Sequence, residues 1–258
     1  MTSPAPATGP AIAFLHPDDP PDSFPDPSLA AAEPEGLLAV GGDLTPARLL
    51  AAYSRGIFPW YEAGQPVLWW SPDPRAVLLP RNLHVSRSLS RTLKRNRYRV
   101  SIDQNFAAVI DACADMRAAT GTWITPEMRA AYLCLHQLGY AHAVEVWLGS
   151  ELVGGLYGIA LGDVFFGESM FSRATDASKV ALVRLVGLAQ DQGMKMIDCQ
   201  LATRHLASLG SQLMPRQVFL QRLQALTAEA GRVGTWREES RPTCGLVPTP
   251  VIQAPLHV

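Results

Sequence analysis

Hydrophobic residues recur along this chain with two different periods, which predicts a mixture of helices and strands. The stretch 151–200 shows both periods most clearly. Gly162 and Asp163 separate two apolar runs, as in a β-hairpin. A segment with helical spacing follows; Asp176 can cap its start, and Gly193 comes just after its end. The predicted order is strand, strand, helix, strand, over residues 151–160, 164–170, 176–190 and 194–200.

Capping residues mark further helices. Thr45 and Thr125 are each followed by a proline, which favours the first position of a helix. The expected helices cover about residues 46–54, 86–94, 103–116, 126–138 and 215–230. Expected strands cover residues 98–102 and 142–148, and a short strand or turn covers residues 36–44. The chain therefore predicts an α+β protein.

The N-terminal third differs in composition from the rest of the chain. The first twenty or so residues are rich in Pro, Ala and Asp and are expected to be disordered. The tail from Arg241 is rich in proline and is expected to be irregular. We expect a small N-terminal domain over residues 1–75 and a larger domain over residues 76–258.

The composition indicates in which cellular compartment the protein works. The chain lacks a run of about 20 apolar residues, and its N-terminus lacks the basic and apolar regions of a signal peptide. Its cysteines show no CxxC spacing, so we interpret them as reduced thiols and expect no metal site. They are Cys113, Cys134, Cys199 and Cys244. These features predict a cytoplasmic protein.

Charge is nearly balanced, with a formal net charge of −1, but it is unevenly distributed. The segment Arg81–Arg99 contains seven Arg or Lys residues and no Asp or Glu. Such a cluster is typical of a phosphate-binding surface, although a solvated helix face would have the same composition.

Polar side chains stand where two of the predicted strands end. Glu168 and Ser169 lie near the end of the predicted strand 164–170, and Asp198 and Gln200 lie near the end of the predicted strand 194–200. Asp198 and Gln200 are two positions apart, so their side chains should share one face of a strand. A carboxylate there must be paired, hydrogen-bonded or shifted in pKa. The pattern indicates either a functional site or strand ends that solvent reaches.

The order of the predicted elements resembles the GNAT acyltransferase fold, a mixed sheet flanked by helices. In that fold the sheet splits near its middle and the substrate occupies the split. The resemblance places Glu168, Ser169, Asp198 and Gln200 beside it. Members that use acyl-CoA carry a glycine-rich loop after the fourth strand. Here the loop at residues 172–178 has no glycine and contains an aspartate, which argues against CoA.

A set of short motifs, in a fixed order, is similar to the leucyl/phenylalanyl-tRNA–protein transferase family. The motifs extend from about Gly36 to Phe219 and include GLLAVGGDL, AYSRGIFPW, WWSPDPR, HVSRSL, LVGGLYG, GESMFS and IDCQ. The resemblance implies transfer of Leu, Phe or Met from aminoacyl-tRNA to proteins whose first residue is Arg or Lys. The product would be marked for degradation through the N-degron pathway, and no cofactor or metal is implied.

The same resemblance assigns roles to particular residues. Gln200 would hold the attacking amine through its carboxamide oxygen and Asp198 would polarise Gln200, making these two the catalytic residues. The residues implied in substrate binding are Trp60, Trp123, Tyr132, Phe165, Glu168, Ser169 and Met170. The residues implied in tRNA binding are Arg87, Arg91, Lys94, Arg95 and Arg97. For Glu168 a structural hydrogen bond is the alternative role, and for Tyr132 and Phe165 it is core packing.

Two other functions compete with aminoacyl transfer. An acetyl-CoA-dependent N-acetyltransferase would share the fold but lacks support from the loop at residues 172–178. A tRNA-binding protein without catalysis would leave Asp198 and Gln200 as structural residues. Thr203 departs from some relatives, in which an asparagine is expected, and this alters any contact with the terminal adenosine. We expect a monomer, since no feature of the sequence requires a dimer.

Overall fold

The computed structural model describes residues 12–116, 121–229, 231, 233–236 and 238–243. Its largest element is an eight-stranded sheet in the order β11-β5-β10-β9-β8-β7-β6-β12. The strands are β5 (Arg75–Leu78), β6 (Arg99–Ile102), β7 (Ala141–Leu148), β8 (Glu151–Leu161), β9 (Val164–Ser172), β10 (Met196–Gln200), β11 (Gln212–Met214) and β12 (Glu238–Pro242). β6 to β9 are antiparallel, whereas β9 and β10 run parallel.

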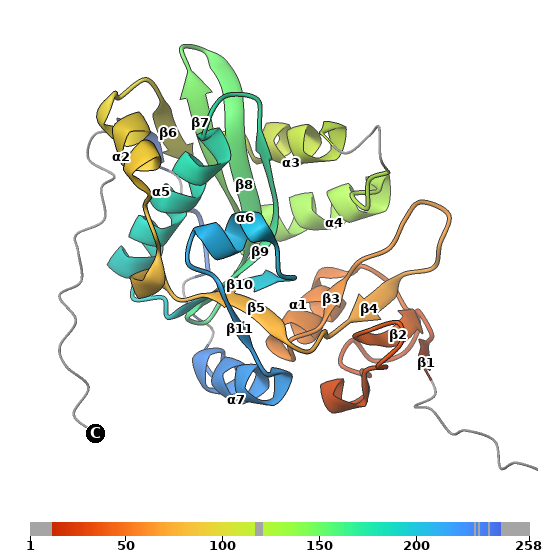
Figure 1. Ribbon diagram of the computed structural model, residues 1–258. Coiled ribbons are helices and arrows are strands. Elements are labelled where there is room, and N and C mark those ends of the chain that lie inside the picture. Colours follow the sequence, from red (N-terminus) through yellow and green to blue (C-terminus); the bar gives the residue numbers. More distant parts are fainter. Residues whose placement is uncertain (1–11, 117–120, 230, 232, 237, 244–258) are drawn as a thin grey trace, which may run out of the picture.

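Helices cover both faces of this sheet (Figure 1). They are α1 (Pro46–Ser54), α2 (Arg87–Lys94), α3 (Phe106–Asp115), α4 (Pro126–Gln137), α5 (Ala177–Asp191), α6 (Arg204–Ser208) and α7 (Arg216–Leu226), with single 3-10 turns at Pro27–Leu29 and Pro80–Asn82. Neighbouring strand residues enter different cores: Ala143 packs with α3 and α4, whereas Val144 packs with α5. This alternation is the period of two expected of a strand buried on both faces.

The sheet opens between its two central parallel strands. The pairing between β9 and β10 ends at Phe166 and Asp198, and beyond this point β9 pairs with β8 alone and β10 with β5 alone. Glu168 and Gln200 therefore stand just beyond the last paired residues. This is the split that the predicted fold places beside the substrate.

The fold class is confirmed. The structure has a mixed sheet flanked by helices, in the predicted order, with a smaller N-terminal sheet beside it. Thr45 and Thr125 cap α1 and α4, as expected from their sequence. The boundary between two domains near residue 75 stays a prediction, since one hydrophobic core contains residues from both sides of it, among them Leu49 and Tyr157.

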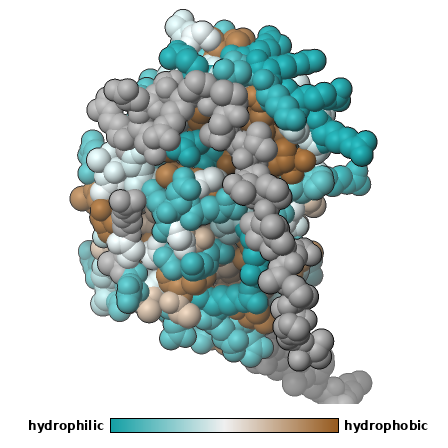
Figure 2. Space-filling model, turned by 90° about the vertical axis from the view of Figure 1, so that its left-hand side faces the viewer, coloured by the Kyte–Doolittle hydropathy of each residue, from teal (hydrophilic) through white to brown (hydrophobic). Residues whose placement is uncertain are grey.

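The side of the molecule that carries α2 and α5 is mostly hydrophilic. Figure 2 views the protein from this side, and hydrophilic residues make up most of its coloured surface. Within the described residues, no helix combines the length and the hydropathy that crossing a membrane would require.

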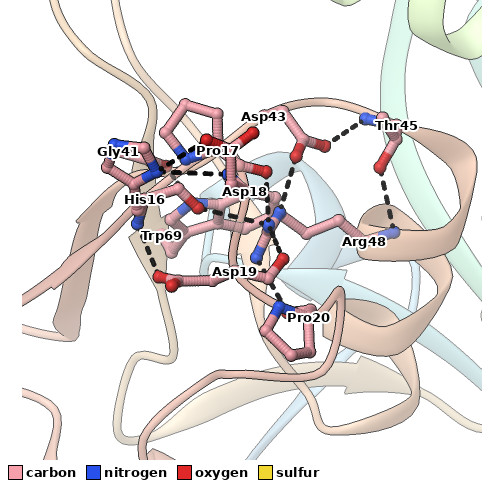
Figure 3. Close-up of polar contacts among 10 residues, drawn as sticks. All are labelled: His16, Pro17, Asp18, Asp19, Pro20, Gly41, Asp43, Thr45, Arg48 and Trp69. Atoms are coloured by element: carbon pink, nitrogen blue, oxygen red, sulfur yellow. Dashed lines mark hydrogen bonds and ion pairs between the residues drawn. The ribbon is translucent and has the colours of Figure 1, made fainter.

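The N-terminal segment is more ordered than expected. The small sheet has the order β1-β2-β4-β3, with strands β1 (Ala13–Leu15), β2 (Leu37–Gly41), β3 (Phe58–Pro59) and β4 (Leu68–Trp70). The buried Arg48 guanidinium donates to the carbonyls of His16, Pro17, Asp19 and Pro20, and pairs with Asp43 (Figure 3). These bonds fix residues 16–20, so the expectation of disorder is wrong there; residues 1–11 lie outside the described part.

Two boundaries and one helix cap also differ from the sequence-based expectation. The helix expected from Asp103 begins at Phe106, because the Asp103 carboxylate binds His142 and the backbone N–H of Ala143 instead. Asp176 makes no capping hydrogen bond to α5. The tail expected to be irregular from Arg241 begins as strand β12, paired with β6. Cys244 lies outside the described residues.

Candidate active site

A cavity of about 570 Å³ lies where β9 and β10 part. Its walls are mainly apolar and come from β3, β8, β9, β10, α5, α6 and the segment before α4. Among its lining residues are Trp60, Trp123, Phe165, Met170, Leu182, Leu185 and Ile197. Polar groups reach it from Glu168, Ser169 and Gln200. An apolar chamber with a few convergent polar groups is the usual form of a small-molecule site.

Glu168 is held by three neutral donors. The Tyr53 hydroxyl donates to Oε1 at 2.7 Å, and the Tyr132 hydroxyl donates to Oε2 at 2.7 Å. The Gln200 side-chain amide donates to Oε1 at 2.8 Å. Tyr53 and Tyr132 also lie 2.6 Å apart, oxygen to oxygen. Four side chains from α1, α4, β9 and β10 thus form one buried cluster at the cavity wall.

The environment of Glu168 disfavours its negative charge. Burial raises the pKa of Glu168 to about 7, even though hydrogen bonds from Tyr53, Tyr132 and Gln200 pull that pKa down. The negative charge of Asp198 adds to the upward shift. Near neutral pH this carboxyl group is therefore divided between its ionised and protonated forms.

Asp198, unlike Glu168, is paired with a positively charged side chain. It is fully buried, and Arg75 binds it with two nearly parallel bonds, Nε to Oδ1 at 2.9 Å and Nη2 to Oδ2 at 2.7 Å. The Arg75 guanidinium also lies against the Phe58 and Phe219 rings, 4.7 and 4.8 Å from their centroids. Such a bidentate pair satisfies the buried charge of both partners.

Gln200 connects the two carboxylates. Its backbone N–H donates to Asp198 Oδ1 at 2.9 Å, while its side-chain amide donates to Glu168. The residue has a φ of 61°, and the pairing of β10 with β5 shifts register between Asp198 and Gln200. Regular alternation ends at this irregularity, so the rule that would place both side chains on one face does not apply. None of the described residues donates to the Gln200 carboxamide oxygen.

Comparisons with known proteins identify the family. The model of the leucyl/phenylalanyl-tRNA protein transferase family matches residues 77–224, and that of its N-terminal domain matches residues 42–73. Transferases of this name are 60% identical over 79% of this chain and 91% of the protein from Ectopseudomonas mendocina, and 59% identical over 83% of this chain and 90% of the protein from Aromatoleum aromaticum. The chain belongs to the leucyl/phenylalanyl-tRNA–protein transferase family.

Solved structures are much more distant. An L-PGS structure from Bacillus licheniformis is 11% identical and covers 61% of this chain and 54% of its own, with a TM-score of 0.37. A GCN5-related N-acetyltransferase from Kribbella flavida is 13% identical and covers 66% of this chain and 61% of its own, with a TM-score of 0.33. The assignment to the transferase family therefore rests on the sequence relatives.

Most residues that the sequence singled out meet at this site. Those that line the cavity are Trp60, Trp123, Phe165, Glu168, Ser169, Met170 and Gln200. Tyr132 does not line it but stands behind Glu168 as a hydrogen-bond donor. Asp198 reaches Gln200 through the backbone N–H rather than through the carboxamide that it was expected to polarise. Thr203 lines the cavity and caps α6, a helix that the sequence did not predict.

The sequence-based reasoning did not identify two residues of the candidate site. Tyr53 lies on α1 and Arg75 on β5, both far along the chain from the residues they bind. Both occur within family motifs, AYSRGIFPW and WWSPDPR, but neither follows an amphipathic pattern that marks it as functional. An arginine in a strand of buried residues was the available signal for a buried ion pair.

The basic segment forms an exposed surface at one edge of the transferase. Arg87, Arg91 and Lys94 lie on α2, and Arg95 and Arg97 follow its end, all five exposed. Within the described part of the chain, no carboxylate forms an ion pair with them. Their charge is therefore open to a ligand that carries phosphate groups.

The loop before α5 is poorly suited to binding a diphosphate. Asp176 accepts bonds from Lys179 and Thr92 at 2.8 and 2.9 Å, at the N-terminus of the helix. Burial alone would raise the pKa of Asp176, but these hydrogen bonds outweigh it and hold that pKa below its usual range. A fixed negative charge where acyl-CoA enzymes bind pyrophosphate disfavours CoA.

Proposed function

We propose that this protein transfers Leu, Phe or Met from aminoacyl-tRNA to the α-amino group of proteins that begin with Arg or Lys. The transfer forms a peptide bond and marks the acceptor for degradation through the N-degron pathway. The observation that carries the proposal is the apolar cavity that ends at Gln200 and Glu168 in a member of this transferase family. The donor ester is already activated, so the reaction draws on no cofactor.

The cavity supplies a binding site for the donor amino acid. Aromatic and aliphatic side chains form its walls, with Trp60, Trp123, Phe165 and Met170 among them. Met170 is an unbranched thioether that adapts to different shapes, which suits a site for both Leu and Phe. We propose that these four residues hold the amino-acid side chain and that Ser169 contacts its polar end.

Gln200 is proposed to orient the attacking amine. Its side-chain amide is committed to Glu168, which leaves the carboxamide oxygen directed elsewhere as an acceptor for an amine N–H. A carboxamide is a very weak base, so it positions the amine and does not deprotonate it. Asp198 fixes the backbone of Gln200 from the buried side. Correct orientation of two reactants can lower a barrier by roughly 7–11 kcal/mol.

The basic surface on α2 is proposed to bind the tRNA. Its five cations are Arg87, Arg91, Lys94, Arg95 and Arg97. Several tRNAs serve as donors, so recognition must rest on phosphate contacts, which carry no sequence information. The affinity for tRNA should then fall steeply as salt rises. We propose that the protein acts as a monomer in the cytoplasm, where charged tRNA is found.

The decisive experiment is transfer of labelled leucine from charged tRNA to a short peptide that begins with Arg, beside the same peptide beginning with Ala. The proposal predicts label on the Arg peptide alone. Label on neither peptide, with tRNA still bound, would favour a tRNA-binding protein without catalysis. Label on both would remove the claim of a basic acceptor.

The same assay tests Gln200. Gln200→Ala should slow transfer on the order of 10²-fold, because the amine loses its positioning group. Gln137→Ala is a matched control, since Gln137 is an exposed amide at the end of α4 and does not line the cavity. Equal transfer by the two variants would remove Gln200 from the mechanism.

A further inference from the structure

The cluster around Glu168 contains three short oxygen contacts, two from Glu168 to a tyrosine and one between Tyr53 and Tyr132. Each phenol hydroxyl carries one hydrogen, and an ionised carboxylate carries none. When Glu168 is ionised, both hydroxyls point to it, and the 2.6 Å contact between the tyrosines has no hydrogen. The ionised cluster is therefore one hydrogen short.

A proton on Glu168 completes the cluster. Glu168 then donates to Tyr53, Tyr53 donates to Tyr132, and Tyr132 donates to the second Glu168 oxygen. All three contacts become hydrogen bonds in a closed ring. Burial raises the pKa of Tyr53 and Tyr132 well above the usual range, so the phenols keep their own protons. The vacant position in the ring belongs to a proton from outside the cluster.

The charged groups packed around the cluster do not supply that proton. Tyr157 acts on both phenols electrostatically, and Asp198 acts on Glu168 as a negative charge from β10. The cation next to Asp198 is Arg75, which is committed to Asp198 by two bonds. Glu168 itself lines the cavity beside Gln200, so the proton can arrive from a molecule bound there.

We propose that Glu168 is the catalytic residue that accepts the proton of the attacking amine, and that Tyr53 and Tyr132 are its positioning residues. This inference rests on the proposed aminoacyl transfer. The neutral amine attacks the ester carbonyl, and a C–N bond forms. The nitrogen loses one proton to Glu168, the C–O bond to the ribose breaks, and Glu168 returns the proton to the ribose oxygen. No proton or electron is gained or lost over the cycle.

The pKa of Glu168, raised by burial to about 7, suits this role. A general base works best when its pKa lies near the operating pH. The competing role for the same carboxylate is an ion pair with the basic side chain of the acceptor's first residue. That role needs a carboxylate that is permanently ionised, whereas the ring favours one that gains and releases a proton.

The test is single-turnover transfer by wild type and Glu168→Gln over a range of pH, with the acceptor peptide titrated to saturation at each pH. The glutamine keeps the shape of the side chain but cannot take up a proton. The expected result is a loss of roughly 10²-fold in the transfer rate with little change in peptide KM. The wild-type pH–rate profile should contain an acidic limb with a midpoint near pH 7, and Glu168→Gln should keep only the limb that comes from titration of the acceptor amine.

Two controls test whether the acidic limb of the pH–rate profile comes from Glu168. The limb should stay in place for two acceptors whose α-amines differ in pKa, since an amine titration would move with the acceptor. Glu145→Gln is the matched variant: Glu145 on β7 is also buried, but it accepts hydrogen bonds from the Ser101 hydroxyl and from the backbone N–H groups of Gln104 and Asn105, and it does not line the cavity. It should keep both the wild-type rate and the limb.

The outcomes are distinct. A raised peptide KM in Glu168→Gln, with the rate and the limb unchanged, would overturn the proposal in favour of side-chain recognition. A limb near pH 7 that survives in the variant and does not move with the acceptor would likewise overturn it. Failure of wild type to transfer at any pH would instead contradict the proposed function. Thermal unfolding of each variant shows whether a loss of rate follows from a loss of folded protein.

Discussion

Two buried carboxylates lie on either side of Gln200, and the protein treats them differently. Asp198 has a full positive charge from Arg75 in bidentate contact. Glu168 has only neutral donors, namely two phenols and one amide. The first arrangement fixes a charge in place, and the second leaves a charge that a proton can remove. One neighbour therefore suits a scaffold, and the other suits proton transfer.

The largest expected effect on stability comes from removing Arg75, the positive charge that pairs with Asp198. Arg75→Met leaves Asp198 ionised, buried and unpaired, which should lower the free energy of unfolding by about 3–5 kcal/mol. Urea unfolding followed by circular dichroism measures the loss. A loss below about 1 kcal/mol would show that Asp198 does not depend on Arg75 for its charge.

A double variant separates stability from positioning. Arg75→Met with Asp198→Leu removes both charges together and should recover most of the lost stability. Transfer should stay slow, because the Gln200 backbone N–H has lost its acceptor. Full recovery of transfer would show that the ion pair serves the fold alone.

Glu168 is expected to have a smaller effect on the free energy of unfolding, and this effect depends on pH. The pKa of Glu168 is raised from 4.5 to about 7, so the folded state holds a proton that the unfolded chain has already released. The resulting stability is present below pH 4.5 and is lost as pH rises through 7. Unfolding of Glu168→Gln should show no such loss, which amounts to roughly 3 kcal/mol in wild type.

The measurement is the difference in unfolding free energy between wild type and Glu168→Gln at pH 4 and at pH 8. Titrations of all other groups are common to both proteins and cancel. A difference that stays constant over this range would mean that Glu168 has an ordinary pKa in the folded protein.

The residues of the site also differ in how far the sequence predicted their positions. Glu168 and Gln200 were expected near each other because both follow apolar runs that resemble neighbouring strands. Tyr53, the partner of Glu168, and Arg75, the partner of Asp198, could not be found in this way, because a contact across more than a hundred residues leaves no periodic signal. The closed ring at Glu168 is likewise a product of tertiary packing.

The same limit applies to the fold. Caps and periodicity predicted α1, α4 and the strands β6 to β10 of the large sheet with small errors at their ends, whereas β5, β11 and β12 were not predicted. The exceptions occur where a side chain binds across the fold: Arg48 orders residues 16–20, and Asp103 binds β7 instead of starting a helix. Local patterns predict elements, and long-range polar contacts decide their boundaries.

The most direct test of this account is a titration of the Glu168 carboxyl group by carbon-13 NMR, in protein labelled at its glutamate side chains. The Glu168 resonance is the one missing from Glu168→Gln. The account predicts a midpoint near pH 7, as expected for a buried carboxyl with neutral donors. A midpoint near 4.5 would contradict it, because Glu168 would then be an ordinary carboxylate with no vacancy for a proton.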